Sequence, residues 1–173
     1  MNPIQIKSKL ANGGKVYGTM LWAIDSARMA SFLDSEYLDY AIIEAEHAPR
    51  TLYQINAMTT ALRNKNITSI VRITSPNSEI AGATIDAGAD GILVPYCEDI
   101  EELKLSFGRT YFNPLKGEYL KKVLDKGEFP SKKSEDYLRE KSKSRLFILG
   151  IESVPAVNNL EKMINSVEKI DGI

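Results

Sequence analysis

Residues 40–49, Tyr-Ala-Ile-Ile-Glu-Ala-Glu-His-Ala-Pro, decide the fold: an apolar, β-prone run ends in two carboxylates and the only histidine of the 173-residue chain. A short apolar run bounded by proline is typical of a buried strand. Side chains alternate along a strand, so Ile42, Glu44 and Glu46 should share one face, where two carboxylates need a partner. His47 follows at the end of this strand, which is where parallel α/β folds carry their active sites.

Simpler interpretations of the same residues stay open at this point. A single histidine is more often a structural or surface residue than a catalyst, and Glu46 also fits the N-cap or first turn of the next helix. The only cysteine, Cys97, is better explained as a packed residue at a strand end than as a nucleophile. The residues at the other strand ends therefore decide between a structural and a functional interpretation.

Strand-like and helix-like segments alternate five times along the chain. Apolar runs predict strands at 16–22, 40–46, 68–74, 91–96 and 145–152, and helical spacing predicts helices at 26–33, 51–63, 79–87, 99–107 and 155–164. Such alternation with short connections predicts parallel βαβ units with right-handed crossovers. A doubly wound open sheet is the alternative. Neither a Gly-x-Gly-x-x-Gly motif after the first strand nor a Walker loop is present, so nucleotide binding has no support.

The number of units sets the predicted fold class, which is α/β with a partial (β/α)8 TIM barrel. A closed barrel needs eight units and about 250 residues. This chain holds about five units and the opening of a sixth strand at residues 171–173. We therefore expect a single, truncated barrel domain over residues 1–173, with its functional residues at the carboxyl ends of the strands.

One segment interrupts the alternation. Residues 108–145 carry 11 of the 22 lysine and arginine residues but only 6 of the 23 acidic residues. The segment is longer than a usual connection from helix to strand, so we expect a basic helical insertion. A solvated helical excursion is the simpler interpretation, and a lid or basic collar over an anionic substrate is the alternative. No aromatic platform is interleaved with the charge, so nucleic-acid binding is not expected.

The composition is that of an ordinary soluble globular protein. Its net charge of −1 gives no general attraction to nucleic acid or to a membrane. A single cysteine excludes an intramolecular disulfide and fits a reducing compartment. The sequence shows neither a secretory signal nor an apolar run of about 20 residues. We therefore expect a cytoplasmic protein with no membrane and no nucleic-acid partner.

The strand ends together supply a base, a cation and carboxylates. The second strand delivers Glu44, Glu46 and His47, the third delivers Arg72, and the fifth delivers Glu152. An arginine inside an apolar strand cannot be buried unpaired, so Arg72 either grips a substrate carboxylate or pairs internally with Glu44 or Glu46. Glu152, with one histidine and no cysteine nearby, suits Mg²⁺, Mn²⁺ or Co²⁺ better than Zn²⁺.

Four blocks of sequence carry a resemblance to a known family. They are Glu44-x-Glu-His-Ala-Pro49, Val71-Arg72, Asp86-Ala-Gly-Ala-Asp-Gly-Ile-Leu-Val-Pro95, and Ile151-Glu152 followed by Asp171-Gly172. Together they resemble the HpcH/HpaI aldolases, which are metal-dependent class II pyruvate aldolases on a (β/α)8 barrel of the phosphoenolpyruvate/pyruvate superfamily. The resemblance covers most of the chain outside the basic insertion.

The resemblance implies a role for each matching residue. His47 matches the family's acid/base histidine, and Glu44 takes the place of a carboxylate that orients it. Arg72 matches the arginine that holds the carboxylate and enolate oxygen of pyruvate. Glu152 matches the first metal ligand, and the second would lie beyond Ile173.

Three further residues complete the set. Asp86 matches an aspartate that reaches the site of a neighbouring subunit, so the resemblance also implies a homo-oligomer. Val94 and Pro95, at the end of the fourth strand, are expected to line the substrate site. The implied reaction forms or cleaves a carbon–carbon bond through a pyruvate enolate, with a 2-oxo acid and an aldehyde as partners and a divalent metal as cofactor.

The sequence departs from the family pattern in several places, which leaves other functions open. The family usually has Asp at the position of Glu44 and often Gln at the position of Gly150, and residues 114–117 replace an arginine-glycine segment. A citrate lyase β-type enzyme, with CoA phosphates on the basic insertion, is one alternative. A non-catalytic, truncated homologue that keeps only the fold is the other.

Overall fold

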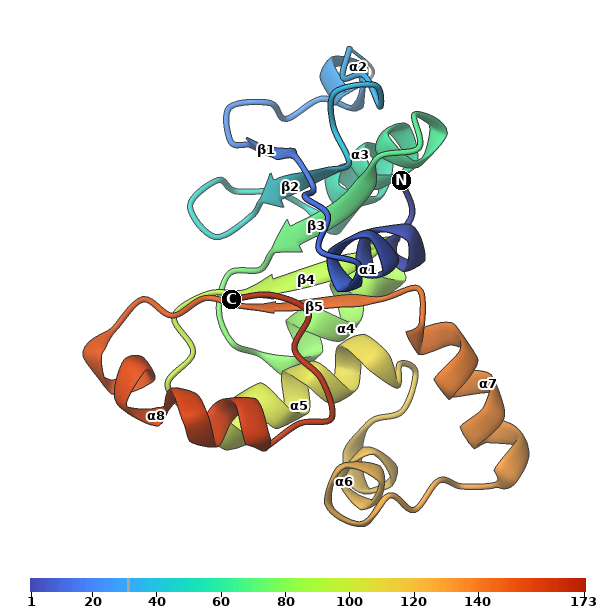
Figure 1. Ribbon diagram of the computed structural model, residues 1–173, viewed down its shortest axis with the longest axis vertical. Helices are drawn as coiled ribbons and strands as arrows, with labels where there is room; N and C mark the ends of the chain where they lie inside the picture. The colour runs from blue at the N-terminus through green and yellow to red at the C-terminus, as the bar shows by residue number, and fades with distance from the viewer. Residues whose placement is uncertain (31) are drawn as a thin grey trace.

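The structure, a computed structural model, describes residues 1–30 and 32–173 and consists of a five-stranded sheet with helices packed around it (Figure 1). The strands are β1 (Gly18–Leu21), β2 (Tyr40–Glu44), β3 (Thr68–Arg72), β4 (Gly91–Val94) and β5 (Leu146–Leu149). The helices are α1 (Pro3–Ala11), α2 (Ala27–Ala30), α3 (Leu52–Asn64), α4 (Ser78–Asp86), α5 (Ile100–Tyr111), α6 (Gly117–Lys126), α7 (Lys132–Ser142) and α8 (Val154–Asn165).

All neighbouring strands run parallel and follow one another in chain order, from β1 to β5. A doubly wound sheet reverses its direction of growth at a switch point, whereas an order that never reverses is that of one side of a (β/α)8 barrel. The predicted α/β fold with a barrel-type parallel sheet is therefore confirmed. Gly172 forms a parallel bridge with Ile148, so the segment predicted to open a sixth strand lies beside β5.

Two apolar clusters cover the two faces of the sheet. The larger cluster packs α3, α4, α5 and α8 against strand residues such as Ile43, Val71 and Ile92. The smaller cluster joins Ile6 of α1 to Ile70 on the opposite face. Ile70 and Val71 are neighbours in sequence but belong to different clusters, as the alternation of side chains along a strand requires. The first face is the outer face of the sheet, and the second is its inner face.

Helix α1 is the element that the apolar patterns did not predict. Polar signals define it: Asn2 Oδ1 accepts from the Gln5 backbone N–H at 2.9 Å, and Gln5 Oε1 accepts from the Asn2 backbone N–H at 2.9 Å. This pair is a capping box, and Pro3 occupies the first turn, where its missing N–H costs nothing. The helix lies against the inner face of the sheet (Figure 1).

The predicted helices at 51–63, 79–87, 99–107 and 155–164 correspond to α3, α4, α5 and α8. Within the helix predicted at 26–33, the structure shows the short helix α2 (Ala27–Ala30), and residue 31 lies outside the described residues. No helix in the described part of the chain is long and apolar enough to cross a membrane.

The strands end earlier than predicted, and β2 shows the physical reason. β2 was expected to reach Glu46 but ends at Glu44. Glu44 Oε1 accepts hydrogen bonds from the backbone N–H groups of Glu46 at 2.7 Å and His47 at 2.9 Å. These bonds turn the chain away from the ladder directly after the strand, because a carboxylate replaces the next strand as the acceptor.

The basic segment 108–145 holds the end of α5 and the two helices α6 and α7. It connects α5 to the amino end of β5. Figure 1 shows α7 beyond that end and α6 on the outer side of α5, both away from the carboxyl ends of β2 and β3. A lid over a site at the strands' carboxyl ends is therefore excluded for this segment. Its charges pair locally, as in Lys122–Glu118 at 2.7 Å and Arg139–Glu135 at 2.9 Å, which fits a solvated helical excursion.

Candidate active site

Arg72 and two glutamates form a charge cluster at the carboxyl ends of β2 and β3. Glu44 and Arg72 are partners in the strand ladder, and Arg72 Nε donates to Glu44 Oε2 at 2.5 Å. Arg72 Nη1 lies 3.3 Å from Glu46 Oε2. The two glutamates therefore contact the same guanidinium, although Glu46 lies beyond the end of β2, and the internal pairing considered for Arg72 exists.

Glu44 is the fixed anion of this cluster, with 0 % of its surface exposed. Burial acts to raise the pKa of Glu44, but hydrogen bonds from the His47 backbone N–H, the Arg72 guanidinium and the Glu46 backbone N–H outweigh it and hold the pKa below its usual range. Glu44 therefore stays ionised. It anchors Arg72 and the backbone of His47 rather than exchanging protons itself.

The imidazole of His47 lies at the open side of the cluster, with 56 % of its side chain exposed. Its Nε2 is 3.5 Å from Glu46 Oε2, and its ring stacks on Trp22 with centroids 5.8 Å apart and planes inclined by 22°. A cavity of about 430 Å³ lined by Glu46, His47 and Arg50 opens beside it. An imidazole beside a carboxylate and next to a cavity can exchange a proton with a bound small molecule.

The ends of β4 and β5 are tied together by side chains of the loops that follow them. Glu152 Oε1 accepts from the backbone N–H of Tyr96 at 3.2 Å, and Ser153 Oγ donates to Glu98 Oε1 at 2.5 Å. Tyr96 adopts a φ of 45°, in the left-handed region. The Glu152 carboxylate thus braces a strained turn at the rim of the sheet.

Val94 and Pro95, predicted to line the substrate site, are both buried. Val94 belongs to the cluster on the outer face of the sheet, together with Ile92. Its side chain therefore faces away from the inner face that carries Glu44 and Arg72. The structure gives Val94 a packing role, because the strand period places it on the opposite face from Leu93.

The close approach of the Glu152 carboxylate leaves no room for a side chain at Gly150. A Cβ at this position would lie 2.7 Å from Glu152 Oε1 and 3.0 Å from the Val94 carbonyl oxygen. We expect Gly150→Ala to displace the Glu152 carboxylate and to lower the free energy of unfolding by about 1–3 kcal/mol, as overpacking does. Urea denaturation measures the change.

The matched control for this substitution is Gly172→Ala. A Cβ at Gly172 would meet Ile148 side-chain carbons at 3.7 Å, which is ordinary contact. We expect Gly172→Ala to change the free energy of unfolding by no more than about 0.5 kcal/mol. Equal effects of the two substitutions would contradict the steric explanation for Gly150.

Glu152 alone does not make a metal centre. Across residues 1–30 and 32–173, no group of three or more His, Cys, Asp or Glu side chains is arranged to hold a metal ion. One oxygen of Glu152 already accepts from Tyr96, and a hard cation needs six or more oxygen ligands or several retained waters. The described residues therefore do not complete the predicted metal site.

Asp86 lies at the other end of the sheet from His47. It is the last residue of α4, whose chain continues directly into β4 at its amino end, and its Oδ1 accepts from Asn113 Nδ2 at 2.6 Å. Asp86 therefore does not contribute to the cluster of its own chain. The role predicted for it requires a second copy of the chain, and both the role and the homo-oligomer remain predictions.

Cys97 is buried and is held in its protonated form. Burial raises the pKa of Cys97 to about 11, and the carboxylate of Glu102 acts in the same direction. A thiol in this state is a poor nucleophile at neutral pH. The interpretation of Cys97 as a packed residue at a strand end is confirmed.

Trp22 and Arg50 are the residues of the site that the sequence did not identify. Trp22 follows β1, and its place at a predicted strand end was the only available signal. Arg50 follows Pro49 in the loop after β2, and nothing in the sequence distinguishes it from a solvated arginine. Their importance depends on three-dimensional contacts between the ends of two strands.

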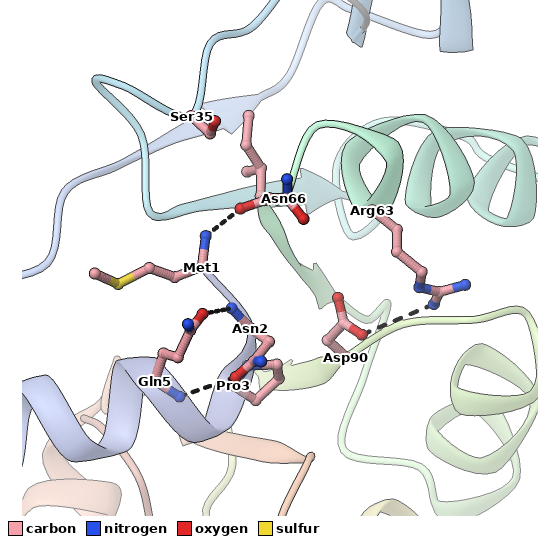
Figure 2. A pocket seen from close by; sticks show the side chains of 9 residues that line it. Met1, Asn2, Pro3, Gln5, Ser35, Arg63, Asn66 and Asp90 are labelled. Carbon is pink, nitrogen blue, oxygen red and sulfur yellow. Dashed lines mark hydrogen bonds and ion pairs between the residues drawn. The ribbon is translucent and has the colours of Figure 1, made fainter.

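Another cavity, of about 440 Å³, lies near the amino ends of the strands (Figure 2). The amino group of Met1 donates there to the Asn66 carbonyl oxygen, and Arg63 pairs with Asp90 at 3.8 Å. These charges are paired with protein groups, and the lining includes no histidine. The cluster around His47 is therefore the stronger candidate for chemistry.

Comparison with protein families gives one domain match. Residues 19–173 match the family model described as HpcH/HpaI aldolase/citrate lyase. Among curated proteins, the hydroxypyruvate/pyruvate aldolase of Roseovarius nubinhibens is 24% identical over 96% of this chain and 64% of its own length. The 2-keto-3-deoxy-L-rhamnonate aldolase of Escherichia coli K12 is 23% identical over 96% of this chain and 61% of its own length. The chain thus spans less than two thirds of the length of these relatives.

Solved structures agree with the fold. The HpcH/HpaI aldolase of Desulfitobacterium hafniense superposes with a TM-score of 0.73 at 23% identity, over 95% of this chain and 64% of that chain. The citrate synthase SbnG gives a TM-score of 0.75 at 23% identity, over 95% of this chain and 62% of that chain. Macrophomate synthase gives 0.72 at 22% identity, over 98% of this chain and 59% of that chain. At these identities the similarity supports the fold alone.

Proposed function

Because the chain belongs to the HpcH/HpaI aldolase/citrate lyase family, we propose that it is a carbon–carbon lyase that acts through the enolate of a small 2-oxo acid. Pyruvate is the proposed 2-oxo acid, and an aldehyde is its partner in the bond that forms or breaks. The names of two relatives, a hydroxypyruvate/pyruvate aldolase and a 2-keto-3-deoxy-L-rhamnonate aldolase, support this class of substrate.

One observation carries the proposal: His47 and Arg72 lie on either side of the same carboxylate. Glu46 Oε2 is 3.5 Å from His47 Nε2 and 3.3 Å from Arg72 Nη1. A proton acceptor and a fixed cation are therefore neighbours at the strand ends. Enolisation needs this combination, because one group removes a proton while the other stabilises the negative charge that develops on oxygen.

The first step of the proposed reaction is proton removal from the methyl group of pyruvate. The C–H bond breaks, its proton goes to the imidazole of His47, and its electron pair forms the enolate. Arg72 holds the substrate carboxylate and the enolate oxygen; its Nη2 takes part in neither of its contacts with Glu44 and Glu46. Glu44 keeps the guanidinium in place, since it is buried and ionised.

The second step forms the carbon–carbon bond. The enolate carbon attacks the carbonyl carbon of the aldehyde, whose π electrons move to its oxygen, and the imidazolium of His47 returns the proton to that oxygen. Cleavage is the reverse. A divalent cation of the Mg²⁺, Mn²⁺ or Co²⁺ class, with Glu152 as one ligand, remains part of the proposal without an assigned step.

Exchange of the pyruvate methyl protons with D₂O, followed by proton NMR, tests this function without knowledge of the aldehyde. We expect the methyl signal to decay faster with protein than in buffer, measured both with and without added Mg²⁺ or Mn²⁺. An exchange rate equal to that of buffer under every metal condition would contradict the proposal. It would leave the non-catalytic homologue as the better interpretation.

The position of the basic segment 108–145 argues against the CoA-thioester alternative. That alternative placed CoA phosphates on the basic segment. In Figure 1, α7 lies beyond the amino end of β5 and α6 lies outside α5, whereas His47 follows the carboxyl end of β2. Phosphates bound on α6 or α7 would therefore be remote from the reacting groups. The small 2-oxo acid is the better supported substrate.

A further inference from the structure

Arg50 joins the ends of β1 and β2 beyond the last pair of the ladder. That last pair is Leu21 and Ile43. Past it, Arg50 Nε donates to the Glu44 carbonyl oxygen at 2.6 Å, and Arg50 Nη2 donates to the carbonyl oxygens of Leu21 at 3.0 Å and Trp22 at 2.7 Å. One guanidinium thus connects three backbone carbonyls from two neighbouring strand ends.

The contacts of Arg50 are hydrogen bonds to the backbone rather than ion pairs. Each contact that the described part of the chain shows for it is to a backbone carbonyl. A guanidinium presents its N–H donors in a rigid planar fork, so it can fix several acceptors relative to one another. A lysine ammonium on its flexible stem lacks this fork.

The two strand ends that Arg50 connects carry the two rings of the site. Trp22, whose carbonyl Arg50 holds, stacks on the imidazole of His47. The backbone N–H of His47 is held at 2.9 Å by the side chain of Glu44, whose carbonyl Arg50 also holds. The hydrogen bonds of Arg50 to the Glu44 and Trp22 carbonyl oxygens therefore link the backbone positions of the two rings.

We propose that Arg50 is a positioning residue that keeps Trp22 stacked on His47 and so holds the imidazole beside Glu46. This inference rests on the proposed function, in which His47 moves the proton. Misplacement of a reacting group by about 1 Å can cost up to about 100-fold in rate. We therefore expect Arg50→Gln to lower kcat for pyruvate exchange about 10- to 100-fold, with little change in KM.

A measurement without substrate tests the positioning directly. Trp22 is the only tryptophan of the chain, so tryptophan emission comes from this side chain alone. The imidazole of His47 stacks on one face of the indole, so this stacking limits the access of acrylamide, a neutral quencher, to Trp22. We expect acrylamide to quench the emission more strongly in His47→Ala than in the wild-type protein, because this protection is lost.

A neutral quencher avoids the charged groups around His47. Glu46 faces Nε2 at 3.5 Å, and Arg72 of β3 pairs with Glu46 at 3.3 Å. The His47→Ala variant keeps both groups, so the difference between its quenching constant and that of the wild type measures the protection by the imidazole. In Arg50→Gln we expect more than half of this protection to be lost.

Arg63→Gln is the matched control. Arg63 Nη2 donates to the Gly88 carbonyl oxygen at 2.7 Å, near the amino end of β4, and so has a comparable structural role far from His47. We expect this variant to keep the wild-type protection of Trp22 from acrylamide. If Arg50→Gln does not fold, Arg50→Lys replaces it, with the same expected loss of protection.

Wild-type protection of Trp22 from acrylamide in the folded Arg50 variant would overturn the positioning role. So would an equal loss of protection in Arg63→Gln, because it would show a general effect of stability. The outcome is separate from the proposed function: the expected loss of protection in Arg50→Gln, together with no pyruvate exchange in the wild type, would contradict the lyase activity while leaving the role of Arg50 in place.

Discussion

Replacing Arg72 with leucine is expected to lower the free energy of unfolding by about 3–5 kcal/mol and to abolish pyruvate exchange. Glu44 has no exposed surface, and Arg72 is its only charged partner among the described residues. Without the guanidinium, a carboxylate held by two backbone N–H groups is left uncompensated inside the sheet. Urea denaturation at neutral pH measures the stability, and NMR measures the exchange.

A double variant separates the charge from the packing. In Glu44→Gln/Arg72→Leu both charges are absent, so we expect most of the lost stability to return while exchange stays absent. Arg63→Leu is the control for loss of an exposed ion pair, since Arg63 lies 3.8 Å from Asp90 with 56 % of its side chain exposed. That control should cost no more than about 1 kcal/mol. Equal costs for Arg72→Leu and Arg63→Leu would contradict the buried-pair interpretation.

The buried ion pair of Glu44 and Arg72 also predicts how the stability of the protein depends on pH. The pKa of Glu44 is lower in the folded protein than its usual value of 4.5, so the folded state binds this proton less readily than the unfolded chain. The contribution of Glu44 to stability is therefore fully present above about pH 4.5 and is lost as the pH falls through the folded-state pKa. Acid unfolding followed by circular dichroism measures this loss, and in Glu44→Gln this part of it should be absent.

Replacing His47 with alanine is expected to lower the rate of pyruvate methyl exchange by about 10²- to 10⁴-fold, the usual contribution of a general base. The imidazole is 56 % exposed, so the free energy of unfolding should change by no more than about 0.5 kcal/mol. Activity and stability would thus separate in this variant, whereas in Arg72→Leu both fall together.

Added imidazole provides the control for His47→Ala. The cavity of about 430 Å³ beside the ring gives a small base access to the vacated position, so partial recovery of exchange is expected. An exchange rate in His47→Ala equal to that of the wild type would rule out His47 as the proton acceptor. Loss of folding in the variant would contradict the exposed position of the ring.

The sheet could be predicted well because strand alternation is a local property. From Tyr40 to Glu44 the period of two places Ile42 and Glu44 on one face, and Glu44 indeed meets Arg72 of the next strand. The parallel order followed from the regular alternation of strands and helices. The two interpretations of Arg72 are compatible, because its internal contacts use Nε and Nη1, and the substrate proposed for it would meet Nη2.

What the sequence did not predict depends on contacts between segments far apart in the chain. Arg50 acts on carbonyls of Leu21 and Trp22, which belong to the end of the preceding strand. Val94 was expected at the substrate site because it ends a strand, but alternate residues at a strand end face opposite sides, and Val94 packs in the outer core. Its contact with substrate stays a prediction. Helix α1 was missed because its signals are caps rather than an apolar period.

The helices α6 and α7 offer a practical use that follows from their place away from the carboxyl ends of β2 and β3 (Figure 1). The turn between them contains Gly127, where an added Cβ would meet no other atom within 4 Å. An affinity tag or a dye attached in this turn would be remote from His47. A protein immobilised through it would hold its reactive rim toward the solution, which suits surface-based binding measurements and flow reactors.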